Sequence, residues 1–431
     1  MRFFSDNAAA AHPNVARIRE LPRAELVRPA PGTAPAKKSA KAGIGIADNV
    51  AWIGADQAWA QGTRGHGVTV GVIDTGAYYT HNALRRQYRG WLGGDSYEHD
   101  YNWFYPGALS AEPEVNDTHG THVIGTIAGD DHASDPAERN RIGVAPGAQW
   151  IACLGLTADG DNASLLLGCG EFMLAPTRTD GSDPQPDLRP QVINNSWSEN
   201  NCNGEATSFY ADVVDAWVAS GIFPVFAAGN TSGCGLMEPP GLSSISSPAS
   251  LAAAFAVGST GNHDGIYATH SLWGPTVEIS PGLPTLPDPR GFPQLKPQVV
   301  APGVDIVSAY DGFADDYGSM TGTSMSSPHI AGLVALMLEA GECLVGDYPA
   351  VGGLIMIDHR GEQVKEAGPS MPVQVLGLND VAEAGDSFVV NALDLTSSAL
   401  LVGAAAVGWR GIGRLSAANV QTRSAANRAT P

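Results

Sequence analysis

The stretch VTVGVIDTG, residues 68–76, decides the fold class of this chain of 431 residues. Its first six residues are almost all apolar and β-branched, which is typical of a strand covered on both faces in a parallel sheet. Asp74 stands where this strand should end. An Asp in that place is often only a turn or cap residue, but a buried carboxylate needs a cation or a hydrogen-bond donor. If the strand is buried, another segment must supply a partner for Asp74.

Similar apolar runs recur along the chain, each closed by small or polar residues: QVINNSW (191–197), IFPVFAAGN (222–230), AFAVGST (254–260) and PQVVAPG (297–303). Stretches of helical character lie between the runs, at 121–128, 205–220 and 324–340. This alternation predicts right-handed crossovers in an α/β fold with a mainly parallel sheet. Ligands of such sheets bind at the carboxyl ends of the strands, so the polar residues that close the runs are candidates for function.

Composition and charge narrow the class of protein. With 52 Gly and 30 Pro, the chain favours a loop-rich enzyme over a helical bundle. Its formal net charge of -20 argues against nucleic acid as a partner, because phosphate binding needs clustered Lys and Arg. The best candidate for a membrane span, residues 398–409, is shorter than the roughly 20 residues that a bilayer requires. Residues 1–30 lack the apolar core of a secretory signal.

The five cysteines fit neither a zinc motif nor a dense disulfide framework. Cys202 and Cys234 follow two strands that we expect side by side, so we predict a disulfide between them first. A bridge from Cys153 to Cys169 is the second prediction. Buried free thiols are the alternative, and because the number is odd, one cysteine must stay unpaired.

A histidine suited to acid–base chemistry lies in the segment DTHGTHVIGTIAG, residues 117–129. Asp117 or Thr118 can cap a helix here, which places His119 in its first turn. A neutral imidazole can take a proton from a hydroxyl and return it to a leaving amine when a carboxylate fixes its tautomer, and Asp74 can serve as that carboxylate. His122 could instead pair with His119 as a metal ligand, but the HExxH pattern of zinc proteases is absent, so a packed side chain is favoured.

A serine stands at the start of a predicted helix, because GTSMSSPH, residues 322–329, leads into a strongly helical run. We expect Pro328 in the first turn of this helix, where its missing N–H costs little. Ser324 then lies at the positive end of the helix dipole, and its own N–H can point at a developing oxyanion. A helix cap is the alternative role for an isolated serine.

The segments around Asp74, His119 and Ser324 resemble the three signature segments of the subtilisin-like serine proteases, or subtilases, in the family's order. The resemblance covers about residues 45–343 and implies a three-layer subtilisin-like α/β fold. Residues 51–74 and the later INNSW look most like the bacillopeptidase F branch of the family. FAAGN, ending at Asn230, is similar to the family segment whose Asn side chain binds the oxyanion.

The resemblance also implies a substrate site. Subtilases hold an extended peptide as an added strand. The matching segment here is Asn195, Ser196, Trp197 and Ser198, and the far wall of the first specificity pocket would be Ala227, Ala228 and Gly229. Ser198 stands where the family usually has Gly, so the mouth of this pocket is expected to be narrower or more polar.

Two further segments have open interpretations. An aromatic and acidic insertion could shape a substrate subsite, but packing over the domain is favoured; it includes Tyr101, Trp103, Phe104, Tyr105 and Glu112. An acidic loop could hold structural calcium, which is common in subtilases, but a solvated loop is favoured; it contains Asp130, Asp131, Asp135 and Glu138. No catalytic metal or cofactor is expected.

The chain divides into four predicted regions. Residues 1–44 read as a flexible basic leader or the remnant of a prosegment, and residues 45–343 as the peptidase domain. Residues 344–390 are rich in short strand patterns, and from 353 they resemble part of a barrel of bacterial translation initiation factor two. Residues 391–431 are Ala-rich and are expected to be loose or partly helical.

The sequence therefore predicts a serine endopeptidase in which Ser324 is the nucleophile, His119 the base and Asp74 its partner, with Asn230 in the oxyanion site. Polypeptides would be its substrates, and a prosegment or protein inhibitor a further partner; an exported location follows by analogy with the family. An inert peptide-binding module of the same shape is the alternative. Ribosome or nucleotide binding through the C-terminal region ranks below both, because no GxxxxGK[ST] loop is present.

Overall fold

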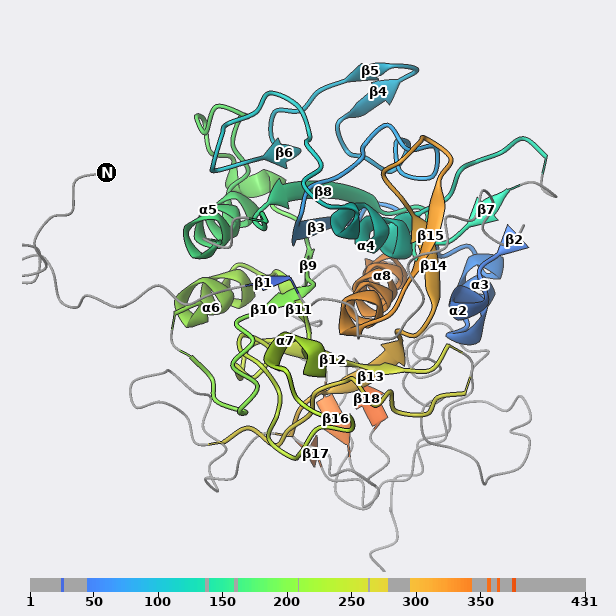
Figure 1. Cartoon of the computed structure of the whole chain (residues 1–431). Helices are drawn as coiled ribbons and strands as arrows, with labels where there is room; N and C mark the ends of the chain where they lie inside the picture. Colours follow the sequence, from blue (N-terminus) through green and yellow to red (C-terminus); the bar gives the residue numbers. More distant parts are fainter. Residues whose placement is uncertain are drawn as a thin grey trace, which may run out of the picture.

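A sheet of seven parallel strands forms the centre of the computed structural model (Figure 1). The structure describes residues 45–342 except 136–138, 159–161, 208, 263 and 278–294, together with the backbone at 25–26, 355–357, 363–364 and 374–376. The strand order is β13-β12-β11-β9-β3-β8-β6. In chain order the strands are β3 Thr69–Asp74, β6 Trp103–Phe104, β8 Gln149–Leu154, β9 Val192–Asn195, β11 Phe223–Ala227, β12 Phe255–Thr260 and β13 Val299–Pro302.

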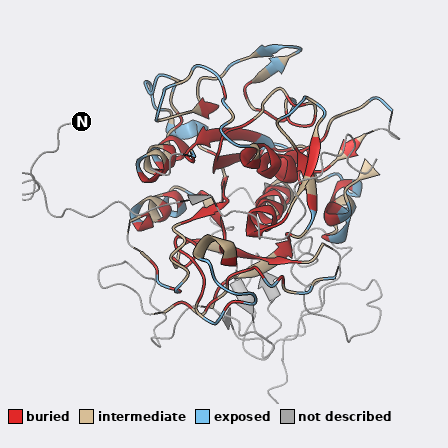
Figure 2. Cartoon of the chain, viewed as in Figure 1, coloured by how far each residue is buried: buried red, intermediate tan, exposed pale blue. Residues whose placement is uncertain are grey.

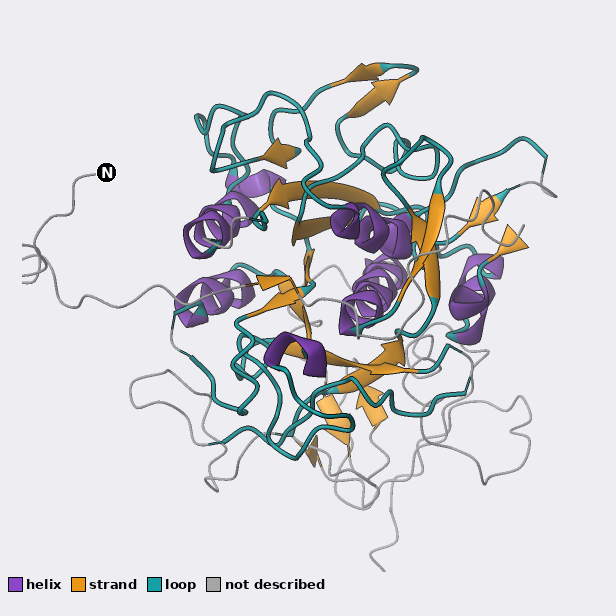
Figure 3. Ribbon diagram, viewed as in Figure 1, coloured by secondary structure: helices purple, strands orange, loops and turns teal. Residues whose placement is uncertain are grey.

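Helices cover both faces of this sheet, so the predicted three-layer α/β fold is confirmed (Figures 1 and 3). On one face α4 (Thr118–Ala128) and α8 (Thr323–Glu342) share a core with alternate strand residues such as Val70 and Val72. On the other face α5 (Ala163–Leu174) and α6 (Ala211–Ala219) share a second core with residues such as Ile73. Because neighbouring residues of β3 face opposite cores, the strand reads as a continuous apolar run.

Smaller elements surround the three layers. The remaining helices are α2 Asp48–Trp52, α3 Ala55–Ala60, the 3-10 helix η1 Pro186–Leu188 and α7 Thr231–Cys234. Three two-stranded pairs are β2 Gly45–Ile46 with β7 Asn140–Arg141, β4 Trp91–Gly93 with β5 Ser96–Tyr97, and β14 Ile306–Ala309 with β15 Tyr317–Met320. Among the described residues, no helix is long and apolar enough to cross a bilayer.

Glycines let α4 approach its neighbours closely. A Cβ atom on Gly120 would lie 2.2 Å from the carbonyl oxygen of Gly76, just after β3, and one on Gly125 would lie 2.3 Å from Ser308 Oγ. Both distances are far below van der Waals contact, so any side chain at these positions would push the helix away. The small residues of this segment therefore fix how near the helix lies to the end of β3.

Both predicted disulfides form. Cys202 is bonded to Cys234, and Cys153 to Cys169. The first bridge joins the segment after β10 (Trp197–Ser198) to the end of α7, and the second joins β8 to α5. Cys343 lies outside the described residues.

The aromatic insertion packs over the domain, as the sequence favoured. The Trp103 side chain is completely buried and donates to Ser110 Oγ at 3.1 Å. Phe104 stacks on Phe172 of α5, with ring centroids 5.3 Å apart. Tyr101 lies nearer the surface, where its hydroxyl donates to Asp183 at 2.6 Å. The insertion thus packs onto both cores, since Trp103 belongs to the first and Phe104 lies against the second, while the neighbouring β4 and β5 are partly exposed (Figure 2).

The ends of the chain are described only at short strands. In the leader, β1 (Glu25–Leu26) pairs antiparallel with β10. In the C-terminal region, β16 (Ile355–Ile357) pairs antiparallel with β17 (Gln363–Val364) and β18 (Gln374–Leu376), in keeping with the predicted β-rich segment. The predictions of a flexible leader and an Ala-rich tail at 391–431 fall on residues outside the described part.

Two buried histidines predict a loss of stability in acid. Burial lowers the pKa of His122 to about 3 and that of His329 to about 4. In an unfolded chain, the pKa of a histidine is near roughly 6.5. At pH values between the lowered pKa and roughly 6.5, the unfolded chain therefore binds more protons than the folded chain. The free energy of unfolding then falls as the pH drops below roughly 6.5. Each histidine should contribute about 1.4 kcal/mol per pH unit. Urea unfolding at pH 7 and pH 5, followed by circular dichroism, measures this slope.

A matched pair of variants separates these histidines from the rest of the chain. His329→Gln should flatten the pH dependence, whereas Ser250→Ala should leave it unchanged, because it removes a buried hydroxyl that does not titrate. An equal slope in both variants would contradict the assignment to buried histidines.

Candidate active site

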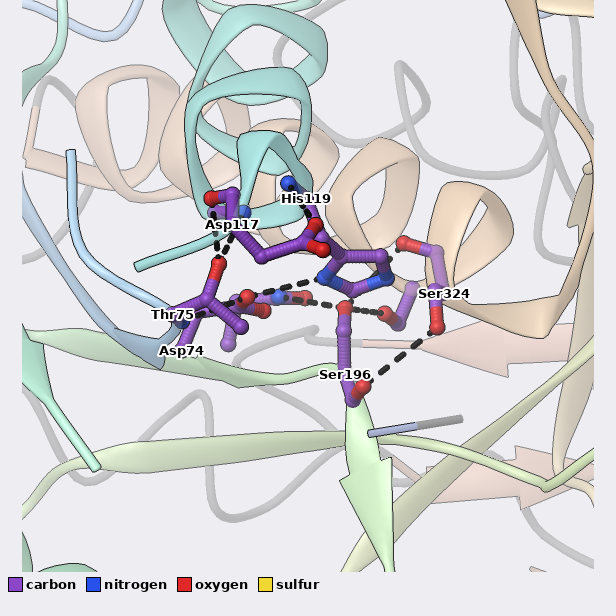
Figure 4. A network of polar contacts seen from close by, with 9 residues as sticks. Asp74, Thr75, Asp117, His119, Ser196 and Ser324 are labelled. Carbon is purple, nitrogen blue, oxygen red and sulfur yellow. Dashed lines mark hydrogen bonds and ion pairs between the residues drawn. The ribbon is translucent and has the colours of Figure 1, made fainter. Parts of the chain in front are cut away.

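The carboxylate that ends β3 does have the partner that its burial demands. Asp74 Oδ1 lies 2.8 Å from His119 Nδ1, and both side chains are only 1% exposed. The same oxygen accepts the N–H of Thr75 at 2.8 Å. A carboxylate in this place holds Nδ1 protonated and leaves Nε2 as the basic nitrogen of the ring. Figure 4 shows the imidazole between Asp74 and Ser324.

Thr75 and Asp117 fix the start of the helix that carries His119. Asp117 is the N-cap of α4 and accepts the His119 N–H at 2.9 Å. Thr75 Oγ1 donates to the Asp117 carbonyl at 2.7 Å and accepts the N–H of Gly120 at 3.0 Å. The cap was expected from the sequence. The role of Thr75 was missed, although its place directly after Asp74 was the available signal.

Ser324 is the second residue of α8 and is 1% exposed. Its Oγ donates to the carbonyl of Ser196 at 3.3 Å, while His119 Nε2 is buried without a hydrogen-bond partner in the described part of the chain. The structure thus brings Asp74, His119 and Ser324 to one site but does not make the bond from serine to histidine. Such bonds are often long or unformed before substrate binds.

The position of Pro328 differs from our expectation. Helix α8 begins at Thr323, so Pro328 is its sixth residue and lies inside the helix, not in the first turn. Its missing N–H therefore removes a hydrogen bond of the helix interior, which would have ended on the carbonyl of Ser324.

Asn230 follows β11 and is the N-cap of α7. Its Oδ1 accepts two hydrogen bonds of 3.0 Å, from the N–H and from the hydroxyl of Thr323, the residue before Ser324. These bonds direct the amide nitrogen away from Thr323 and toward Gly322, where a Cβ atom would lie 2.8 Å from Nδ2. The side chain is thus oriented with its donor end beside the start of α8.

The four residues of the expected peptide-binding segment have different surroundings. Asn195 and Trp197 direct their side chains into the interior: Asn195 Nδ2 donates to Val225 O at 3.2 Å, and the Trp197 ring lies 5.0 Å from that of Tyr210. Ser196 contacts α8. The side chains of these three residues are therefore held within the protein, while the backbone of β10 pairs antiparallel with β1.

The predicted pocket wall is buried and closely packed. Ala227, Ala228 and Gly229 are inaccessible or nearly so, and a Cβ atom on Gly229 would lie 3.3 Å from Ser246 Oγ. Ser198 Oγ donates to Asn200 Oδ1 at 2.9 Å. The disulfide from Cys202 to Cys234 joins the segment that follows Ser198 to the segment that follows Gly229.

Glu199 was not singled out from the sequence. It directly follows β10, and Thr207 Oγ1 donates to its carboxylate at 2.5 Å. Burial raises the pKa of this carboxyl to about 7, against the weaker opposing effect of the Thr207 hydrogen bond. The only sequence signal was its position beside Ser198.

The acidic loop after α4 is only in part the solvated loop that we expected: Asp135 is exposed, Glu138 lies outside the described residues, and the other two carboxylates are bonded within the protein. Asp130 is completely buried and forms an ion pair with Arg139, and Asp131 accepts the side-chain amide of Asn140 at 2.6 Å. His122 is a packed side chain, as favoured: its Nε2 lies 2.9 Å from Ile306 O and 3.1 Å from Gly318 O. Within the described ranges, no group of three His, Cys, Asp or Glu side chains could hold a metal ion.

Several known proteins are similar to this chain. The chain is 40% identical over 314 residues to Bacillopeptidase F of Bacillus subtilis, and the matched region covers 72% of this chain but only 20% of that protein. It is 31% identical to Subtilisin-like protease 3 of Pseudogymnoascus destructans, over 64% of this chain and 53% of that protein. It is 30% identical to Subtilisin DY of Bacillus licheniformis, over 67% and 82% respectively. The chain thus spans only part of the first two relatives.

Two family models match different parts of the chain. The model of elongation factor G domain 2 matches residues 351–391, in line with the resemblance of that region to a translation factor. The model of the subtilase family matches residues 65–344, more than half of the chain, and contains all the segments that meet at the site. The chain belongs to the subtilase family.

Proposed function

We propose that the chain is a serine endopeptidase that hydrolyses polypeptides through an acyl-enzyme. The observation that carries this proposal is the buried contact of 2.8 Å between Asp74 and His119, with Ser324 on the far side of the imidazole. A carboxylate, an imidazole and a hydroxyl in this order are the groups that activate a serine for attack on a carbonyl.

The first half of the reaction forms the acyl-enzyme. Ser324 Oγ attacks the carbonyl carbon of the scissile peptide, and its proton passes to His119 Nε2. Asp74 stabilises the imidazolium, while Asn230 Nδ2 and the Ser324 N–H donate to the oxyanion of the tetrahedral intermediate. The C–N bond then breaks as His119 gives the proton to the leaving amine.

The second half releases the product. Water attacks the acyl carbon and passes one proton to His119 Nε2, and the Ser324 Oγ bond to the acyl group breaks as Oγ regains that proton. All the acid–base and nucleophilic groups come from the chain, so we propose that no cofactor takes part. Calcium, if bound, would only stabilise the fold.

The edge of β10 supports binding of the peptide as an added antiparallel strand, since β1 of the leader occupies it in this manner. The same pairing is compatible with a prosegment or an inhibitor as partner. Two disulfides support an oxidising compartment, and we propose that the enzyme acts outside the cytoplasm.

A fluorophosphonate probe tests the proposal directly. We expect one covalent label on the purified chain, located on Ser324 by mass spectrometry of its peptides, and no label on a Ser324→Ala variant. A folded chain that remains unlabelled would support the alternative of an inert peptide-binding module.

Removing the donor of Asn230 should slow the chemical step. We expect Asn230→Leu to lower kcat by roughly 100- to 1000-fold with little change in KM, the range known for the equivalent donor in subtilisin. The donor acts on charge that develops only in the transition state, so substrate binding should be spared. Steady-state kinetics on a fluorogenic peptide measures both constants. A rise in KM at constant kcat would contradict this role.

A further inference from the structure

Pro328 interrupts the hydrogen bonding of α8 at the residue that we propose as the nucleophile. In a regular helix, the N–H of residue 328 would donate to the carbonyl of residue 324, four residues earlier. Proline has no N–H, so this bond to the Ser324 carbonyl cannot form. A buried carbonyl that loses its donor is costly, and here it belongs to a residue whose position matters for chemistry.

The hydroxyl of Ser196 supplies a donor at this carbonyl. Ser196 is completely buried, and its Oγ donates to Ser324 O at 3.1 Å. Ser196 Oγ accepts from Asn194 Nδ2 at 3.0 Å and lies 2.9 Å from Ser327 Oγ. A hydroxyl has a single proton, so when Ser196 gives it to the Ser324 carbonyl, the Ser327 hydroxyl is the donor of the remaining contact. One donated and two accepted bonds hold this hydroxyl in one orientation.

A second bond runs between the same two residues in the opposite direction. Ser324 Oγ donates to the carbonyl of Ser196 at 3.3 Å. Ser196 lies between β9 and β10, so these bonds tie the helix of the nucleophile to the segment that we propose to hold the peptide (Figure 4).

We propose that Ser196 is a positioning residue for Ser324, because its hydroxyl makes the hydrogen bond that Pro328 denies to the Ser324 carbonyl. This inference rests on the proposed function and gives Ser196 a role distinct from substrate contact. The reaction is sensitive to such positioning, since a displacement of about 1 Å can cost roughly 100-fold in rate.

A double-mutant cycle tests the inference. Ser196→Ala should lower kcat by roughly 10- to 100-fold, with KM changed less than about threefold, because the carbonyl loses its donor and Ser324 shifts. Pro328→Ala restores an N–H at residue 328 that can reach Ser324 O. In that background, the loss of kcat on adding Ser196→Ala should shrink to less than about threefold. The readouts are kcat, KM and the rate of labelling by a fluorophosphonate.

Two further variants guard against a merely structural effect. Ser250 is also buried and donates to the carbonyl of Glu205 at 2.9 Å, so Ser250→Ala removes a similar bond away from α8. It should lower the unfolding temperature by about as much as Ser196→Ala while leaving kcat unchanged. Ser327→Ala removes a bond that Ser196 Oγ accepts but keeps the bond that it donates to Ser324 O, so it should lower kcat less than Ser196→Ala does. This comparison does not need the Pro328 variant, so it tests the inference even if that variant does not fold.

The outcomes separate this inference from the proposed function. An equal loss of kcat from Ser196→Ala with Pro328 and with Ala at that position would overturn it, as would a loss that appears only in KM. If Ser327→Ala costs as much kcat as Ser196→Ala, the donated bond is not the important one. A folded chain that no fluorophosphonate labels would instead refute the proposed function.

Discussion

Replacing Ser324 with Ala is expected to lower kcat by roughly 10^6-fold, the loss known for the same change in subtilisin. The variant keeps the contact between Asp74 and His119 but has no atom that can attack the carbonyl carbon. Peptide binding should change little, because Ser324 Oγ bonds only weakly to Ser196 O, at 3.3 Å, and the backbone of the groove is retained. Steady-state kinetics gives kcat, and binding of an uncleaved peptide gives the affinity.

The control for this variant is the fold itself. The circular dichroism spectrum and unfolding midpoint of Ser324→Ala should match those of the parent, since the change removes one small buried hydroxyl. A folded variant that keeps more than about 1% of the parent kcat would mean that another group is the nucleophile.

Replacing Asp74 with Asn is expected to lower kcat by about 10^4-fold. An amide can donate to His119 Nδ1, which would leave the proton on Nε2, where a base is needed. The loss follows from the 2.8 Å contact between Asp74 Oδ1 and His119 Nδ1, because at that distance the side chain at position 74 decides the tautomer. Kinetics at several pH values measures the loss of kcat, and NMR of the ring protons shows which nitrogen of His119 carries the proton.

A matched change of charge elsewhere provides the control. Asp212→Asn, at an exposed position in the first turn of α6, also removes one carboxylate and should keep kcat within about twofold. If Asp74→Asn remained as active as Asp212→Asn, the carboxylate would not be what orients the imidazole.

The layers and strand ends of this fold were readable from the sequence because the apolar runs are long and distinct. Each run becomes a strand of one parallel sheet, and the polar residues that close the first and third runs, Asp74 at the end of β3 and Asn230 after β11, lie at the site. The disulfide between Cys202 and Cys234 followed from the same reasoning about neighbouring strands, whereas the bridge from Cys153 to Cys169 was only the second choice. The order of the Asp, His and Ser segments then indicated the subtilase family, whose model matches residues 65–344.

Other features could not be read because they depend on contacts between distant residues. Nothing local marks Asp130 as buried, since its partner Arg139 approaches only through the path of the loop. Pro328 was wrongly expected in the first turn of α8, because the helix already begins at Thr323, which is held by Asn230, 93 positions earlier in the chain. Ser196 was assigned to the peptide alone for the same reason: its contacts with Ser324 and Ser327 span more than a hundred residues.

The sequence by itself determined which groups this protein has for chemistry: a carboxylate, an imidazole, a hydroxyl and an amide, each at the end of a strand or the start of a helix. Only the tertiary structure decided how they are held. Thr75 accepts a hydrogen bond from the first turn of the His119 helix, and Thr323 donates to Asn230 and so orients its amide. Ser196 supplies the hydrogen bond to the Ser324 carbonyl that Pro328 cannot make. The physical reason is that residue type and local pattern fix secondary structure, whereas hydrogen bonds about 3 Å long depend on where separate segments meet after packing.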